Sequence, residues 1–162
     1  MNKKIKVGII SDTHGLLREE VKEILEGCDY ILHGGDINRQ EIIDQLEEIA
    51  PLYVVRGNND KEWAEHIPNE LRFQIGTVGF YMIHDKKFIP KTLEDIDIII
   101  FGHSHKYYEE RKDGILWLNP GSCGKRRFDL PISMAVMTIE EGAWEIEKIE
   151  LSQEMNSHRQ NA

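Results

Sequence analysis

Apolar and polar residues in the first third of the chain alternate in blocks that predict strands and helices in turn. A nearly continuous apolar run at 5–11 is typical of a strand buried on both faces. Apolar residues then recur at helical spacing within 18–26 and 39–48, and short apolar segments stand at 30–32 and 52–55. This order is β-α-β-α-β, which implies a parallel sheet with helices packed on it.

The rest of the chain favours antiparallel pairs, because glycine-containing turns separate its short apolar segments. The strands expected there are 70–75, 78–83, 96–101, 107–111, 115–118, 133–139 and 144–151. All except 96–101 are expected to pair as hairpins, so we predict an α/β protein with two sheets in a single domain over 1–151. Residues 152–162 have little to bury and are expected to be a disordered tail.

Composition narrows the class of protein. The formal charge of −9 comes without a basic stripe, so stable nucleic-acid binding is not expected. No apolar run approaches the roughly 18 residues of a membrane span, and the apolar start leads into Asp12 without a cleavage site. Two cysteines without metal-like spacing fit a reducing compartment, so we expect a cytoplasmic protein. The acidity fits either a solvated surface or neutralisation of bound cations.

Side chains that can bind metals follow five of the predicted strands. They are Asp12 and His14 after the first strand, Asp36 after the second, Asn58 after the third, His84 at the end of 78–83, and His103 and His105 after 96–101. Ligands in open α/β sheets bind outside the carboxyl ends of the strands. Seven such residues at one end of a sheet therefore predict a metal site.

The ligand chemistry narrows the choice of metal. Four imidazoles, two carboxylates and one amide suit manganese, iron, zinc, cobalt or nickel better than calcium or magnesium. Seven ligands are too many for one such ion, whereas two ions roughly 3.5–4 Å apart are typical of phosphoesterases. Asp36 is the candidate bridge, because Gly34 and Gly35 let the backbone come close. His103 and His105 reach different ions only if their loop turns.

Five sequence blocks in this order resemble the calcineurin-like metallophosphoesterase superfamily. The blocks are Asp12-Thr13-His14, Gly35-Asp36, Gly57–Asp60, the single His84 and Gly102–His105. The short chain and the segment Asn119-Pro120-Gly121-Ser122 are similar to the small phosphodiesterase branch typified by YfcE. The resemblance covers about residues 4–150 and implies a sandwich of two sheets flanked by helices, αββα.

The same resemblance implies how the ligands divide. Asp12, His14, Asp36 and His105 would hold metal one, and Asp36, Asn58, His84 and His103 would hold metal two. The implied reaction is hydrolysis of a small phosphate ester, most simply a diester, by a hydroxide that bridges the two ions. Asp36, Asn58 and His103 are then the candidate catalytic residues. Manganese is the first candidate cofactor, with nickel, iron, zinc or cobalt as alternatives.

The chain departs from the family pattern at two places. Many relatives have histidine where Asn59 stands, and an amide can donate a hydrogen bond but cannot act as a general acid. His84 is followed by Asp85-Lys86, where the family usually has glycine and often a further histidine. If that backbone needs a positive φ, aspartate is among the residues that tolerate it. Metal two is thus the less secure site.

Other polar residues near the blocks have simpler interpretations. His33 is expected to be a hydrogen-bonded core histidine, and Asp60 to orient the Asn58 loop or to form a structural turn. Ser122 and Cys123 lack a partner base and are not expected to be nucleophiles. The run 124–127 either meets substrate phosphate or is a solvated loop, and the histidines at 66 and 158 look like surface residues.

Two other functions use the same sequence features. The retromer scaffold subunit has this fold and serves as a protein-interaction module, so the fold alone does not establish catalysis. The second alternative function is that of a purely metal-binding or regulatory protein. A Walker-type nucleotide hydrolase is excluded because no Lys-Ser/Thr follows Gly34-Gly35. All seven ligand positions are filled, which favours the enzyme, and exposed hairpin edges would permit a homodimer.

Overall fold

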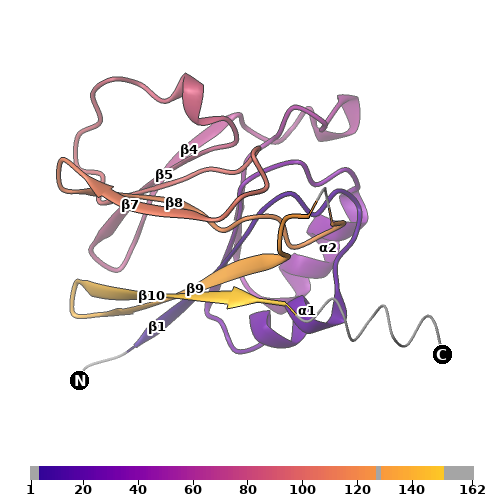
Figure 1. The fold of residues 1–162 in the computed structure, drawn as a ribbon, viewed down its shortest axis with the longest axis horizontal. Helices are drawn as coiled ribbons and strands as arrows, with labels where there is room; N and C mark the ends of the chain where they lie inside the picture. Colours follow the sequence, from indigo (N-terminus) through magenta and orange to yellow (C-terminus); the bar gives the residue numbers. More distant parts are fainter. Residues whose placement is uncertain (1–3, 127–128, 152–162) are drawn as a thin grey trace.

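Two five-stranded sheets stacked face to face form the body of the protein (Figure 1). The computed structural model describes residues 4–126 and 129–151, so the tail predicted at 152–162 lies outside the described residues. Both expected helices are present, as α1 Glu19–Leu25 and α2 Gln40–Ile49. The two-sheet sandwich predicted from the sequence is confirmed.

The first sheet combines the predicted parallel unit with the last hairpin. Its strands are β1 Ile5–Ile10, β2 Tyr30–His33, β3 Leu52–Val54, β9 Ser133–Glu140 and β10 Ala143–Glu150, in the order β10-β9-β1-β2-β3. β1, β2 and β3 run parallel, and β9 pairs antiparallel with β1. Helices α1 and α2 cover the outer face, where Gly8 allows close approach, since a Cβ there would lie 2.3 Å from Leu25 Cδ2.

The second sheet is also mixed. Its strands are β4 Glu70–Ile75, β5 Val78–Ile83, β6 Ile98–Ile100, β7 Tyr108–Lys112 and β8 Ile115–Asn119, in the order β4-β5-β6-β8-β7. β5, β6 and β8 run parallel, with antiparallel strands at the edges. β6 is shorter than the predicted 96–101, and Asp95, with a φ of +61°, lies in the turn that precedes it.

Apolar side chains from both sheets fill the space between them. Val7, Ile9 and Leu32 of the first sheet pack against residues such as Phe80 and Ile100 of the second. Burial on both faces explains why the sequences of the central strands are continuous apolar runs. One face of each central strand packs on the partner sheet, and the other face packs on a second layer.

The outer face of the second sheet has a thinner cover than the first. There the connection from β5 to β6 contributes one 3₁₀ turn, η2 Lys86–Phe88, together with Ile89 and Leu93, which pack on a small apolar cluster. A second 3₁₀ turn, η1 Glu62–Ala64, follows β3 and adds Ala64 to the core beneath the helices. Neither turn was predicted. In the described ranges no helix is long and apolar enough to cross a membrane.

Candidate metal centre

The loops that follow β1, β2, β3, β5 and β6 meet at one end of the sandwich, and they bring all seven predicted ligands together. Five side chains are buried there: Asp12, His14, Asp36, His84 and His105. Asn58 and His103 lie at the exposed rim of the cluster. The two sheets contribute together, because the first three loops come from the first sheet and the last two from the second.

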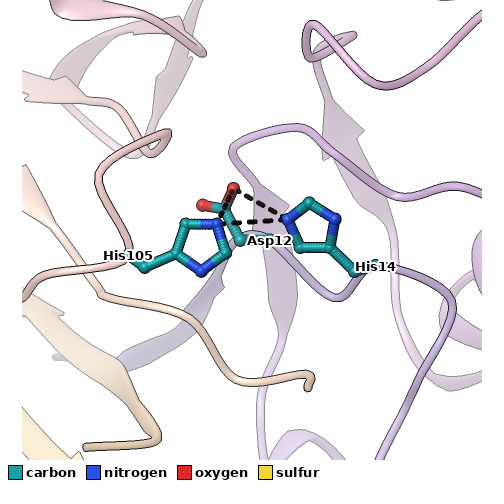
Figure 2. Close-up of side chains that lie close together, drawn as sticks. All are labelled: Asp12, His14 and His105. Carbon is teal, nitrogen blue, oxygen red and sulfur yellow. Dashed lines mark hydrogen bonds and ion pairs between the residues drawn. The ribbon is translucent and has the colours of Figure 1, made fainter. Parts of the chain in front are cut away.

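Asp12, His14 and His105 form the first group of converging donor atoms (Figure 2). The Nε2 atoms of the two histidines lie 3.2 Å apart, and Asp12 Oδ1 lies 3.6 Å from His14 Nε2 and 3.5 Å from His105 Nε2. Figure 2 shows these three atoms directed towards one another. Two imidazole nitrogens and a carboxylate oxygen in this arrangement suit a late first-row divalent ion.

Asp12, Asp36 and His84 form the second group. His84 Nε2 lies 3.2 Å from Asp36 Oδ2 and 3.9 Å from Asp12 Oδ1. The other ring nitrogen, Nδ1, lies 2.8 Å from the carbonyl oxygen of Gly34, which fixes it as the donor and turns Nε2 towards the carboxylates. Asp36 Oδ2 is also 3.6 Å from His14 Nε2, so both carboxylates reach both groups.

The charges in the second group are strongly coupled. Burial alone would lower the pKa of His84, but its hydrogen bond with Asp36 and the charges of Asp12 and Asp36 raise it to about 9. Burial alone would raise the pKa of Asp36, yet the same hydrogen bond and the nearby imidazoles lower it to about 2. A proton on His84 thus supplies the positive charge beside the two carboxylates that a bound cation could supply instead.

Asn58 and His103 face each other at the rim. Asn58 Oδ1 lies 3.2 Å from His103 Nδ1, and the ring of His103 packs edge-on to that of His84, with centroids 5.2 Å apart. The loop turns, as the sequence required: His103 and His105 have φ values of +75° and +65°, and Ser104 N–H donates to the Gly102 carbonyl. The two rings therefore point to different parts of the site.

One buried atom provides the test of whether a metal fits. Within the described residues, Asp12 Oδ1 is fully buried and has no hydrogen-bond partner, although three histidine ring nitrogens lie 3.5–3.9 Å away. An unpartnered carboxylate oxygen is costly to bury unless a cation balances it. The donor set and this oxygen together fit a divalent ion.

Asp60 supports the site from behind. Its carboxylate accepts hydrogen bonds of 2.8–3.1 Å from the backbone N–H groups of Asp36, Ile37, Asn38 and Gly57. It therefore joins the loop after β2 to the loop after β3. Gly57 is needed for this approach, since a Cβ there would lie 2.2 Å from Asp36 Oδ1. The interpretation of Asp60 as an orienting residue agrees with these contacts.

His33 has both ring nitrogens in hydrogen bonds. Nδ1 accepts from the N–H of Gly35, so Nε2 carries the proton and donates to Thr13 Oγ1 at 3.0 Å. The side chain is fully buried, and burial lowers its pKa to about 4. His33 is thus a neutral core histidine that connects the loops after β1 and β2, as the sequence interpretation expected.

Three residues with a role at the site were missed by sequence reasoning. Ser11 Oγ donates to Asp12 Oδ2 at 2.7 Å, and Asn119 Nδ2 donates to the Gly102 carbonyl at 3.0 Å, which holds the loop after β6. Asp85 Oδ2 lies 3.8 Å from His103 Nε2. Two of these residues could have been found from the sequence. Asn119 belongs to the Asn-Pro-Gly-Ser segment, and Asp85 stands where the chain departs from the family pattern.

The remaining candidates are Ser122, Cys123, the basic run after them and Asn59. Ser122 Oγ donates to the backbone carbonyl of Asp12, and burial raises the pKa of the Cys123 thiol to about 12. Both observations agree with the expectation that neither acts as a nucleophile. Lys125 and Arg126 are exposed, and Arg127 lies outside the described residues. Asn59 donates from its backbone and side chain to Asp36, so its amide orients that carboxylate.

Replacing Asp60 tests the support of the two loops. Asp60→Ala leaves four backbone donors without their acceptor, so we expect the free energy of unfolding to fall by about 3 kcal/mol and divalent-ion affinity to fall about 10- to 100-fold. Urea unfolding and calorimetric metal titration measure both. Asp44→Ala, an exposed change on α2, should alter stability by less than about 0.5 kcal/mol. Equal effects of the two changes would contradict the role of Asp60.

The neutral state of His33 predicts a pH dependence. Its pKa is lowered from 6.5 to about 4, so below pH 6.5 the unfolded chain binds a proton that the folded protein does not. Lowering the pH of metal-free protein from 7.5 to 5 should therefore cost about 2 kcal/mol through this residue. His33→Gln should lose that much less stability over the same range in urea unfolding. Parallel losses in both proteins would rule the assignment out.

Known proteins match this chain over most of its length. The model of the calcineurin-like phosphoesterase superfamily domain matches residues 5–142. The probable metallophosphoesterase YsnB of Bacillus subtilis is 33% identical over 153 residues, which cover 86% of this chain and 87% of that protein. The phosphodiesterase MJ0936 of Methanocaldococcus jannaschii is 29% identical over 140 residues, covering 74% and 84%.

Solved structures share the fold at lower identity. Vacuolar protein sorting 29 from Cryptosporidium parvum has a TM-score of 0.73 and 23% identity, covering 92% of this chain and 98% of that one. The phosphoesterase YfcE of E. coli has a TM-score of 0.67 and 23% identity, covering 82% and 87%. The sequence blocks, the two-sheet sandwich and the family match agree, and the chain belongs to the calcineurin-like phosphoesterase superfamily.

Proposed function

We propose that this protein is a phosphodiesterase that uses two divalent ions, manganese first among them, to hydrolyse a small phosphate ester. The observation that carries the proposal is the buried Asp12 Oδ1, which has no hydrogen bond in the described structure and faces the ring nitrogens of His14, His84 and His105. A cation there would balance a charged oxygen that the hydrogen bonds of the described structure leave without a partner.

The proposed ligands divide along the two groups. Asp12, His14 and His105 would hold one ion, and His84 with the rim residues Asn58 and His103 would hold the other. Asp36 Oδ2 would serve both, because it lies 3.6 Å from His14 Nε2 and 3.2 Å from His84 Nε2. Divalent ions held by these residues would supply water activation for attack on phosphorus and would balance the charge that develops on the phosphoryl oxygens.

The protein's own residues orient this machinery. Asn59 donates two hydrogen bonds to Asp36, and the Gly34 carbonyl fixes the tautomer of His84. Because Asn59 is committed to Asp36 and has no acidic proton to give, the site favours esters whose leaving group departs without a protein acid. The half-exposed rim at His103 gives a phosphate ester access to the ions.

A scaffold function is the alternative. Structures of the Vps29 type have the same fold, so the architecture is compatible with a protein-interaction module. Completeness of the site favours catalysis, since all seven ligand positions are filled and converge.

The proposal is tested by hydrolysis after metal reconstitution. Protein loaded with manganese, and separately with the other candidate ions, should hydrolyse bis(p-nitrophenyl) phosphate faster than p-nitrophenyl phosphate. Asp36→Ala and His103→Ala should each lower kcat/KM about 100-fold or more, because each removes a ligand. His66→Ala, an exposed histidine, is the matched control and should be unchanged.

Full metal occupancy measured by elemental analysis, with no hydrolysis under any of the ions, would refute the enzyme and support the scaffold.

A further inference from the structure

We infer that the metal centre has an adjoining subsite for one flat, uncharged aromatic ester group, with Phe88 as its stacking surface. The inference rests on the proposed function, because it places the phosphate of the ligand on the ions. A cavity of about 400 Å³ opens beside the metal centre, and two of the proposed ligands, Asn58 and His84, form part of its wall. A group attached to phosphorus at the ions can therefore enter it directly.

Phe88 lines this cavity and is displayed by the turn η2. Its side chain is 66% exposed, and among the described residues it is the one large apolar side chain left exposed. Asp85 begins the turn by accepting a hydrogen bond from Lys87 N–H, while Ile89 packs into the cluster below. The turn thus buries Ile89 and holds Phe88 outward.

A single exposed apolar residue is ordinary on a protein surface. Phe88 differs from an ordinary exposed residue because it lines the same cavity as the proposed ligand His84, four residues earlier in the chain. A ring that covers Phe88 removes apolar surface of both partners from water and gains the offset-stacking geometry that aromatic pairs prefer. The exposed ammonium of Lys87, 5.2 Å from the Phe88 ring centroid, is weakly held there and can move aside.

Other residues in the lining of the cavity offer hydrogen bonds. Arg56 and Asn69 both line it, and Arg56 donates from Nε and Nη2 to Asn69 Oδ1 at 3.3 and 3.2 Å. These bonds fix the plane of the guanidinium, which carries further N–H donors for ring carbonyl or ether oxygens. The subsite therefore combines an aromatic face with an oriented polar edge.

The charges around the cavity select against a second anionic group. Its lining contains one permanent cation, Arg56, and two carboxylates, Glu70 and Asp85. Glu70 accepts a hydrogen bond from Tyr81, and Asp85 lies near His103. A second phosphate or carboxylate beside Glu70 and Asp85 would be repelled by these carboxylates, of which only Asp85 has a nearby lysine in the described structure, Lys87 at 3.8 Å, whereas a neutral aryl or nucleoside-like group would not be repelled. The ligand class is accordingly a diester with one neutral aromatic ester group.

Stable phosphonates test the subsite without hydrolysis. Calorimetric titration of manganese-loaded protein with methylphosphonate, phenylphosphonate and benzylphosphonate compares ligands of equal charge. The better aromatic ligand should bind about five- to tenfold more tightly than methylphosphonate. Phe88→Leu should abolish this preference and Phe88→Tyr should keep it, while methylphosphonate binds all three proteins alike.

Selection against a second anionic group is tested by comparing the affinities of a charged and an uncharged aromatic phosphonate. 4-Carboxybenzylphosphonate should bind more weakly than benzylphosphonate, and Glu70→Gln should narrow the difference. Equal binding of methyl and aromatic ligands, or an aromatic preference that survives Phe88→Leu, would overturn the subsite, as would a complete lack of phosphonate binding. Failure of the proposed function is distinct, since it is a lack of diester hydrolysis by protein that still binds metal and phosphonate.

Discussion

Left-handed backbone conformations at the ligands are the constraint around which the metal centre is built. Five of the seven proposed ligands have positive φ values: Asp12, His14, Asp36, His103 and His105. Each costs about 1–2 kcal/mol for a residue with a side chain. The loops are held in this state by hydrogen bonds to one another, such as Asp12 N–H to Gly35 O and His14 N–H to Asp36 O, and by the Asp60 carboxylate. The sharp turns aim side chains inward from several strands at once.

The electrostatics depend on this convergence. The two buried carboxylates, Asp12 and Asp36, lie 3.2–3.9 Å from imidazole nitrogens of His14, His84 and His105, so the cluster needs positive charge to be stable. Without a metal, His84 supplies part of it by holding a proton, and Asp36 stays ionised. A divalent ion competes with that proton for the same carboxylates, so the network that stabilises the metal-free loops also shapes the site for a cation.

The periodicity of apolar residues was sufficient to predict the strands and helices, because each central strand is buried on both faces and each helix on one. The convergence of the ligands within each sheet was also predictable, since parallel strands deliver their carboxyl ends to one edge. The meeting of the two edges at one end of the sandwich was not predictable from the strand pattern, because that pattern does not specify how the sheets stack. The contacts of Asp85, Ser11 and Asn119 were not predictable, because they depend on where the loops turn. Nor was η2, whose three residues give too little pattern to indicate a helix.

On the proposed function, the connection from β5 to β6 would contribute to metal binding and to the choice of substrate through different residues. His84 is oriented by the Gly34 carbonyl in the loop after β2, a contact that does not involve the next side chains along its own loop. Asp85 has a φ of −109°, an ordinary extended conformation, so the backbone there requires no glycine. The orientation of His84 therefore does not depend on which residue follows it, whereas Asp85 contacts a second proposed ligand, His103. In this chain the residues after His84 place a carboxylate beside His103 and an exposed aromatic ring at the mouth of the site. On the proposed function, the ligand His84 and the residues that follow it would thus serve different purposes on one loop.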